Sequence, residues 1–543
     1  MKISKPVTVS DARKCLDLNT SDIISASVVN ESLARTDSIP LLDQTGAEVS
    51  TTTFEVATGN IETHTISDKT PLPFEEIPGP AVLKIWEKYW KYVPLLGTQL
   101  FSSLLINRFT QGRLSWNRNV TPLKYLFNEY GCIVRVRGPL SGDIVMIHRP
   151  EHIEEIFKQE GDAPIRSGID ILQHYRLNYR KYRLAGPFSL QSSDWLEVKE
   201  KVEQEFDQIA SKFFNKIDAI CEEFITRIYK IRNGQNEVPA TFHEDMIRWG
   251  MECFCNLIFN KQFGFLESAG YNSTSEPTRV VNALMTAHKY MSRCETGFQV
   301  WRFCLTPFAK KLYEACDVLD GVIGKCVRQA QTKLRSRASR GERCSVTDDS
   351  SPVLEKFLLN EGIHPDDIST LLMDMIILGV QATVNCQAFL LYFLARNPRT
   401  QRKLYYEITS VLPTSDSPFT EATLKRKFKF CYYRRRYRFM AIRYRKGQIS
   451  SQREENFEDP TRFRPERWLN SHDNRGVDFS YLPFGYGVRS CLGKNMAETK
   501  IMLLTAKLVR QFRIEYDYAD IKSRLMMMNV PNKPLRFRFV DRS

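Results

Sequence analysis

The sequence lacks any run of about 18 or more uncharged apolar residues, so we expect no membrane-spanning helix. It also lacks a signal-peptide apolar core at its start. Its 13 cysteines are scattered, without the pairing typical of a secreted scaffold. Cys253 and Cys255 lie close together, but no further His or Cys cluster completes a zinc site. These absences predict an intracellular protein with reduced cysteines.

Acidic residues are missing from one long segment. Between Lys425 and Lys446 there are eleven Lys or Arg residues and no Asp or Glu. Without these eleven charges, the net charge of the chain falls from +14 to +3. Because the remaining chain is only mildly basic, its overall charge does not by itself indicate an acidic partner.

The first 70 residues have few aromatics and no clear apolar period, and they are rich in Ser, Thr, Asp and Val. This composition predicts a disordered leader or tail over 1–70, where targeting information could lie. A Pro-rich hinge over 71–80 follows. With 42% hydrophobic residues in the chain, we expect residues 81–543 to form one large folded domain, with an anomalous segment at 425–450.

Helical periodicity dominates the predicted domain. Apolar residues recur at three- and four-residue steps over 199–229, and a long helix is predicted over 366–396, ended near Asn397 and Pro398. Strand patterns are short, at 132–136, 143–148 and 535–540. We therefore predict a mainly α fold with small β-sheets.

The strongest chemical signal is the segment from Phe484 to Gly493, which reads Phe-Gly-Tyr-Gly-Val-Arg-Ser-Cys-Leu-Gly. It matches Phe-x-x-Gly-x-Arg-x-Cys-x-Gly at every fixed position. A thiolate ligand must be ionised and protected from oxidation, so it needs a rigid, mostly dry loop with backbone N–H groups aimed at the sulfur. An apolar helix predicted over 497–509 follows, and its N-terminus directs positive charge toward the thiolate.

This segment resembles the haem-thiolate signature of the cytochrome P450 family. The resemblance implies haem b (iron protoporphyrin IX), with the Cys491 thiolate as axial ligand of the iron, and monooxygenase chemistry. It assigns Arg489 to a haem propionate and Phe484 to packing against the porphyrin. Gly487 and Gly493 would let the backbone turn sharply and approach the ring.

Other segments extend the resemblance over about residues 75–543. Trp195-x-x-x-Lys199 resembles the helix that holds a propionate, with Lys in place of Arg. Residues 463–468 resemble the meander before the haem loop. The segments 249–252, 301–307, 396–407 and 411–413 resemble the animal mitochondrial clan, in particular its arthropod members. The long polar leader favours family 49, and the ecdysteroid hydroxylases are relatives.

The oxygen-activation motif of the family departs from its pattern here. The aligned segment is Leu378-Gly379-Val380-Gln381-Ala382-Thr383. Gly379 would leave room for dioxygen, but Gln381 replaces the acid and Ala382 the hydroxyl of the usual proton relay. Gln can orient water but cannot exchange a proton near pH 7. Three interpretations follow: Thr383 with water substitutes, a substrate hydroxyl helps, or the protein rearranges an oxidised substrate.

A second departure is the missing Glu-x-x-Arg helix of the family, since no such motif occurs between Glu407 and Arg467. The basic segment stands in its place. Two readings of this segment compete. In the first, the basic residues with their aromatic neighbours bind nucleic acid or anionic lipid; in the second, the segment is an error of gene prediction, such as a frameshift or a skipped exon. We favour the second reading and expect no nucleic-acid partner. In the chain as written, a buried Arg467 without its partner would cost about 3–5 kcal/mol.

The clan resemblance implies partners and location. Electrons would come from an adrenodoxin-like acidic ferredoxin, steered by Lys494 and Lys500, with Lys507 or Arg510 as further contacts. The location would be mitochondrial, on the matrix side of the inner membrane, with peripheral membrane association through apolar loops.

The predicted function is insertion of one oxygen atom of O₂ into a small apolar substrate: a sterol, a hormone-like lipid or a xenobiotic. Two alternatives stay open. The altered motif at 378–383 also fits a haem-thiolate isomerase or peroxide-using enzyme. The anomaly at 425–450 also fits a degenerate, non-catalytic scaffold.

Overall fold

The structure is a computed structural model of the chain. It describes residues 73–79, 122–136, 144–166, 168–296, 299–342, 351–360, 362–414, 417–426, 454–460, 462–465 and 478–542. The predicted leader over 1–70, the basic segment from 427 to 450 and Arg467 lie outside the described residues. Contacts divide the chain into two units, residues 1–92 with 116–147, and residues 93–115 with 148–543. One domain over 81–543 stays a prediction.

The first unit holds a short antiparallel hairpin. Its elements are η1 (Phe74–Glu76), α6 (Pro122–Tyr130), β1 (Ile133–Val136) and β2 (Ile144–Ile147). Both predicted strands are present, and Ile133 pairs with Ile147 in the register. Arg135 ties the Pro-rich segment to this hairpin, because its Nη1 donates to the Phe74 carbonyl at 3.0 Å.

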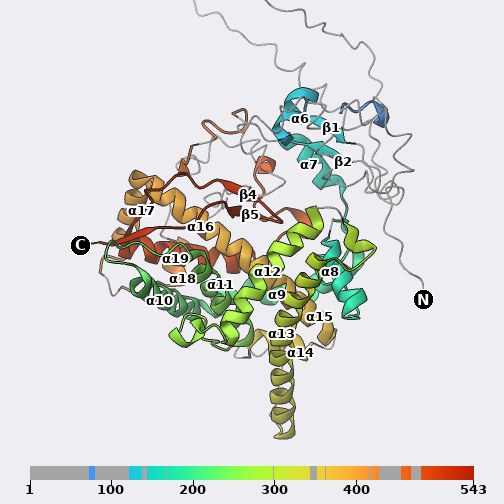
Figure 1. Ribbon diagram of the computed structural model, residues 1–543. Coiled ribbons are helices and arrows are strands. Elements are labelled where there is room, and N and C mark those ends of the chain that lie inside the picture. The colour runs from blue at the N-terminus through green and yellow to red at the C-terminus, as the bar shows by residue number, and fades with distance from the viewer. Residues whose placement is uncertain are drawn as a thin grey trace, which may run out of the picture. The chain divides into compact units, whose positions relative to one another are not determined.

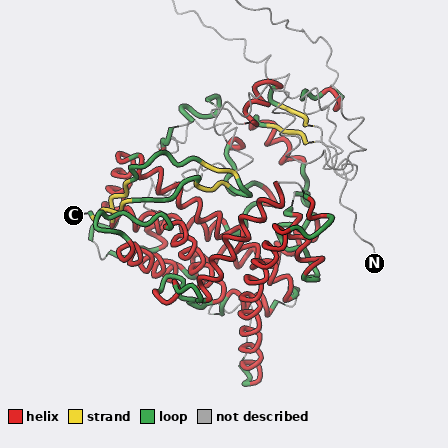
Figure 2. The backbone as a smooth tube through the Cα atoms, in the orientation of Figure 1, coloured by secondary structure: helices red, strands yellow, loops and turns green. Residues whose placement is uncertain are grey.

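The second unit is mainly helical (Figures 1 and 2). Its helices are α7 (Pro150–Gln159), α8 (Asp170–His174), η2 (Tyr175–Tyr179), α9 (Ser192–Lys212), α10 (Phe214–Ile231), α11 (Phe242–Phe259), η3 (Ser268–Tyr271), α12 (Glu276–Thr296), η4 (Val300–Arg302), α13 (Pro307–Ser339), α14 (Val353–Leu359), α15 (Pro365–Asp374), η5 (Met375–Val380), α16 (Gln381–Arg396), α17 (Pro398–Val411), α18 (Glu421–Arg426), η8 (Asp478–Ser480), η9 (Gly487–Arg489) and α19 (Lys494–Gln511). Its strands are β3 (Phe512–Glu515), β4 (Ser523–Leu525), β5 (Asn529–Pro531) and β6 (Arg538–Asp541).

The strands of this unit form two antiparallel pairs, β3 with β6 and β4 with β5. The strand predicted over 535–540 begins later, at Arg538. Leu535 and Phe537 are nevertheless buried, and the Phe537 carbonyl accepts from the Val238 N–H at 2.9 Å. The apolar alternation therefore predicted burial correctly. The strand itself begins only at Arg538, because this is the first residue that pairs with β3, opposite Glu515.

The helix predicted over 199–229 is two helices in the structure. α9 ends at Lys212 and α10 begins at Phe214, with Phe213 between them at φ −113°, ψ 22°. No Gly or Pro marks the break. Both helices bury an apolar face, so the helical period of apolar residues continues across the break. The sequence pattern therefore does not reveal where one helix ends and the next begins.

The long helix predicted over 366–396 is confirmed, with one irregular turn. It begins at Pro365, where His364 Nδ1 accepts from the Asp366 N–H at 3.2 Å, and it ends at Arg396. Its middle turn, η5, is π-helical. Such turns are frequent at functional sites.

This helix is also long and apolar enough to cross a membrane, contrary to the expectation from the sequence. However, 72% of its apolar window is buried inside the protein, so it is the central helix of the core. α11 packs closely against it. A Cβ on Gly250 would lie 2.9 Å from Val384 Cγ2 and 3.0 Å from Val380 Cγ1.

Candidate haem-binding site

The loop that carries Cys491 is closed by its own backbone. The Cys491 N–H donates to the Phe484 carbonyl at 2.8 Å, and the Ser490 N–H donates to the Gly487 carbonyl at 3.1 Å. Gly487 has φ 66°, in the left-handed region that favours glycine, as the motif predicts. These hydrogen bonds close the loop between Phe484 and Cys491. The cysteine lies just before α19, which begins at Lys494.

The other glycine positions differ from the expectation. Gly493, predicted at a sharp turn, has φ −84°, a conformation open to any residue, and caps the N-terminus of α19. The second left-handed glycine is Gly485, with φ 75°. Gly485 occupies an unconstrained position of the motif, which is why the pattern did not single it out.

The Cys491 thiol lies at the N-terminal end of α19 and is exposed, whereas most described cysteines are buried. The pKa of the thiol is raised above its usual value by desolvation and by the charge of Glu498, against the opposing effects of the Gly493 N–H, which donates to the sulfur, and of Lys494. Backbone N–H groups and a helix N-terminus aimed at sulfur are what a thiolate ligand requires. The surroundings of Cys491 therefore suit an iron-bound thiolate.

A second feature lies beside the loop, where Arg489 stacks on Trp195. The Arg489 guanidinium carbon is 4.2 Å from the centre of the Trp195 ring, and its Nη1 donates to the Leu190 carbonyl at 3.0 Å. Burial, together with the charge of Arg166, lowers the pKa of Arg489 to about 10. Among the described residues, no acceptor reaches the buried Trp195 indole N–H. A buried donor beside a partly desolvated cation fits an anionic group such as a propionate.

Arg166 is a candidate that sequence reasoning missed. Its backbone N–H donates to Gln191 Oε1 at 2.7 Å, and its side chain pairs with Glu160. The charge of Arg166 helps to lower the pKa of Arg489, so Arg166 lies near the pair formed by Arg489 and Trp195. No local motif marks it, because it lies 29 residues before Trp195 in the chain.

Lys199, predicted to hold a propionate, is engaged within its own helix. Its Nζ lies 3.3 Å from Glu203, one turn further along α9. A propionate contact would have to compete with this carboxylate. Lys199 is therefore a weaker candidate than Arg489 and Trp195.

The central helix carries a stripe of partly accessible residues. From Leu371 to Tyr392 the side chains are buried except for five residues at helical spacing: Met375, Leu378, Gly379, Ala382 and Cys386. Of the three predicted oxygen-side residues, only Gly379 lies on this stripe. Gln381 and Thr383 are 3% and 5% exposed, and the Thr383 hydroxyl donates to the Gly379 carbonyl at 2.9 Å.

The helix that carries the stripe packs against the helix that follows the cysteine loop. α19, which follows Cys491, packs against α16. Gln387 Nε2 on α16 donates to Thr505 Oγ1 on α19 at 3.1 Å.

The predicted ferredoxin surface is largely wrong. Lys500 is 1% exposed, and burial lowers its pKa. Lys507 is also buried, with its Nζ 2.8 Å from Asp218 Oδ1. Arg510 Nη1 donates to the Ser417 carbonyl at 3.0 Å. Lys494 and Arg510, at the two ends of α19, are partly accessible, whereas the middle of α19 is a core helix and not the solvated face that its charges indicated.

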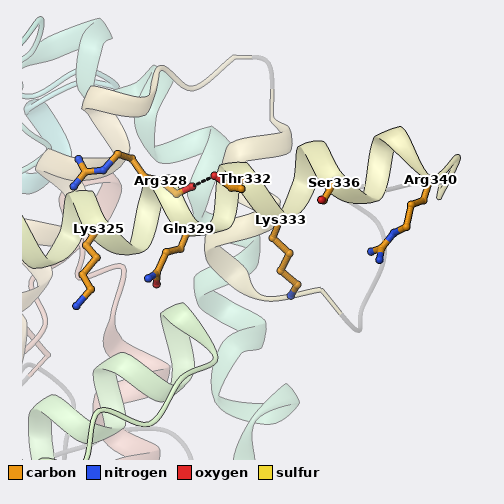
Figure 3. Close-up of a pocket in the computed structure, with 7 residues that line it drawn as sticks. All are labelled: Lys325, Arg328, Gln329, Thr332, Lys333, Ser336 and Arg340. Carbon is orange, nitrogen blue, oxygen red and sulfur yellow. Dashed lines mark hydrogen bonds between the residues drawn. The ribbon is translucent and has the colours of Figure 1, made fainter.

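A separate polar depression of about 540 Å³ runs along α13 (Figure 3). Its lining residues are Lys325, Arg328, Gln329, Thr332, Lys333, Ser336 and Arg340. Several of these cations already have carboxylate partners: Lys325 with Glu276 at 3.2 Å and Lys333 with Glu355 at 2.7 Å. The depression shares no residue with the cysteine loop and is not part of the candidate site.

Comparison with known proteins agrees with this geometry. The family model described as "Cytochrome P450" matches residues 101–426 and 449–539, so the match is interrupted inside the basic segment. "Probable cytochrome P450 12a5, mitochondrial" of Drosophila melanogaster is 30% identical over 513 residues, which cover 86% of this chain and 91% of that protein.

Two further Drosophila melanogaster relatives are each 24% identical. "Probable cytochrome P450 49a1" is matched over 87% of this chain and 83% of its own length. "Cytochrome P450 302a1, mitochondrial" is matched over 85% of this chain and 94% of its own length.

The residues present fit the cofactor of that family. A thiol supported by an N–H group, a buried indole donor without a described partner and an accessible stripe on the central helix are the features that a haem-thiolate site requires. With a family match over most of its length, this chain belongs to the cytochrome P450 family and is a haem-binding monooxygenase.

Proposed function

We propose that this protein is a mitochondrial P450 that oxidises a small apolar substrate with electrons from an acidic ferredoxin. The observation that carries the proposal is the Cys491 loop, closed by its own hydrogen bonds and supported by the Gly493 N–H. The mitochondrial location rests on relatives whose names include that compartment. The ferredoxin follows from the clan that the sequence resembles, with Lys494 as a candidate contact.

In the proposed site, the Cys491 thiolate would hold the haem iron, and Trp195 and Arg489 would bind propionates, with Arg166 nearby. Phe484 would pack against the porphyrin. When bound, the haem supplies oxygen activation, which thiolate donation favours. Gly379 leaves room at the accessible face of the central helix, since an added Cβ there would meet nothing within 4 Å. Thr383, whose hydroxyl donates to the Gly379 carbonyl, would orient water at the same turn of the central helix.

The proposed substrate class follows from the accessible stripe. Met375, Leu378 and Ala382 are partly exposed and offer apolar contacts to a bound molecule. A sterol, a hormone-like lipid or an apolar xenobiotic would gain affinity there by leaving water.

The test is turnover by the purified holoenzyme with a panel of such compounds. We expect substrate-dependent oxygen consumption that requires both reduced ferredoxin and O₂. Omission of either component is the control. Product formation that continues without ferredoxin and O₂ would contradict the proposal and favour the isomerase or peroxide-using alternative, which Gln381 and Ala382 motivate.

Peripheral membrane association is the second part of the proposal. The segment from η4 to the first turn of α13 exposes large apolar side chains: Val300 is 39% exposed, Phe303 83%, Leu305 58% and Phe308 46%. The loop is anchored beneath by Trp301, whose Nε1 donates to the Cys294 carbonyl at 3.0 Å. An exposed apolar patch on a firm base is typical of a membrane contact.

Replacing Phe303 and Leu305 with serine should weaken binding to vesicles that contain anionic lipid by at least about tenfold, because burial of each side chain is worth about 1.5–3 kcal/mol. Vesicle flotation measures the effect. Tyr406→Ser is the matched control, since Tyr406 on α17 is 62% exposed but lies outside the loop. Equal binding by wild type and the double variant would contradict this role.

A further inference from the structure

Three polar side chains lie on helices that pack against one another around the central helix: α11 packs against α12 and α16, and α12 packs against η5. They are His243 on α11, His288 on α12 and Asn385 on α16. His243 Nε2 lies 3.1 Å from Asn385 Oδ1. We call these residues the histidine–asparagine cluster.

Two atoms of this cluster have no described partner. His288 is 5% exposed and Asn385 is 3% exposed. Within the described ranges, nothing hydrogen-bonds to His288 Nε2 or to Asn385 Nδ2. Because buried polar atoms are nearly always paired, these two atoms point to an internal water, which can donate to the imidazole and accept from the amide.

The histidines keep the properties that a water-bound relay needs. Burial, followed by the charge of His243, lowers the pKa of His288 to about 4, so this imidazole is neutral near pH 7. His243 is only half-buried, yet desolvation lowers its pKa too.

The cluster lies one turn from the altered oxygen-activation motif. Asn385 and Gln381 are four residues apart in α16, so they share a face of the helix. Gln381 cannot exchange a proton, whereas a neutral imidazole accepts one on one nitrogen and releases another from the second nitrogen. The imidazole is then unchanged in charge.

We infer that His243, His288 and Asn385 hold an internal water, and that this cluster supplies the proton-exchanging groups missing at Gln381. This inference rests on the monooxygenase reaction, which consumes protons together with electrons. A proton passes from the internal water to an imidazole nitrogen, and the proton on the other nitrogen passes toward water held by Gln381. The internal water recovers its proton from solvent.

The test uses the full-length holoenzyme and variants that keep hydrogen bonding but cannot relay a proton: His288→Asn and His243→Gln. We expect a crystal structure of the wild type to show water within hydrogen-bond distance of His288 Nε2 and Asn385 Nδ2. We expect each variant to consume oxygen about 10- to 100-fold more slowly with reduced ferredoxin, and with a larger solvent deuterium isotope effect. The reduced-CO spectrum should stay unchanged.

His174→Gln is the matched control, because it makes the same change in a half-buried histidine on α8, outside the cluster. Unchanged rates and isotope effects in both cluster variants would overturn the relay, and an ordered wild-type cluster without water would overturn the site. Asn385→Leu, which should lose the water, keeps the inference testable if a histidine variant fails to fold. If wild type consumes no oxygen with ferredoxin, the proposed electron donor fails, and the crystal structure alone decides on the water site.

Discussion

Replacing Cys491 with serine is expected to abolish the thiolate band in the reduced-CO difference spectrum and all oxygen-dependent turnover. Serine keeps the size and the backbone bond to Phe484, but its hydroxyl does not ionise to a thiolate ligand. The loop, with Gly487 in the left-handed region, should still form, and the Gly493 N–H can donate to the serine oxygen in place of the sulfur. The loss would therefore report on ligation and not on folding.

Cys304→Ser is the control for this experiment, because Cys304 is also exposed but lies in the apolar loop before α13. It should leave the band intact. A variant at Cys491 that keeps the band would exclude this residue as the ligand. Wild-type protein that contains haem but shows no band would exclude the thiolate site and favour the degenerate scaffold.

Removing one partner of the buried pair between Arg176 and Asp374 should lower the free energy of unfolding by about 3–5 kcal/mol. Arg176 Nη2 lies 2.6 Å from Asp374 Oδ1, and the two side chains are 0% and 8% exposed. Asp374 also accepts from the Phe188 N–H at 3.0 Å, and Arg176 donates to the Ala185 carbonyl at 2.7 Å. Either single replacement leaves a charge buried without its partner.

Chemical denaturation of the holoenzyme measures this effect with Asp374→Leu and Arg176→Met. The double variant should recover part of the loss, since neither charge then stays buried alone. Lys158→Met, which breaks an exposed pair with Glu154, should leave the transition unchanged. Additive losses in the double variant would show that the two side chains act independently.

This pair also matters for the site. Arg176 lies in η2, which precedes α9, the helix that carries Trp195. Asp374 lies in the central helix, directly before its π-helical turn. We therefore expect the single variants to release haem more readily than the surface control, as measured by haem transfer to an acceptor protein.

The sequence by itself determined the features that depend on neighbouring residues. The fixed spacing from Phe484 to Gly493 predicted a tight loop around Cys491, because a loop that closes on itself is specified within ten residues. The apolar period predicted the long helix from Pro365 to Arg396 for the same reason. The mainly α class with small sheets followed from many such local patterns.

Only the tertiary structure decided which residues are buried and which distant residues meet. Lys500 looked like a surface charge, but α19 packs into the core and buries it. Arg166 and the cluster of His243, His288 and Asn385 were invisible in the sequence, because their partners come from separate helices. Local spacing fixes backbone conformation and nearby contacts, whereas burial and long-range partners arise only when the helices pack.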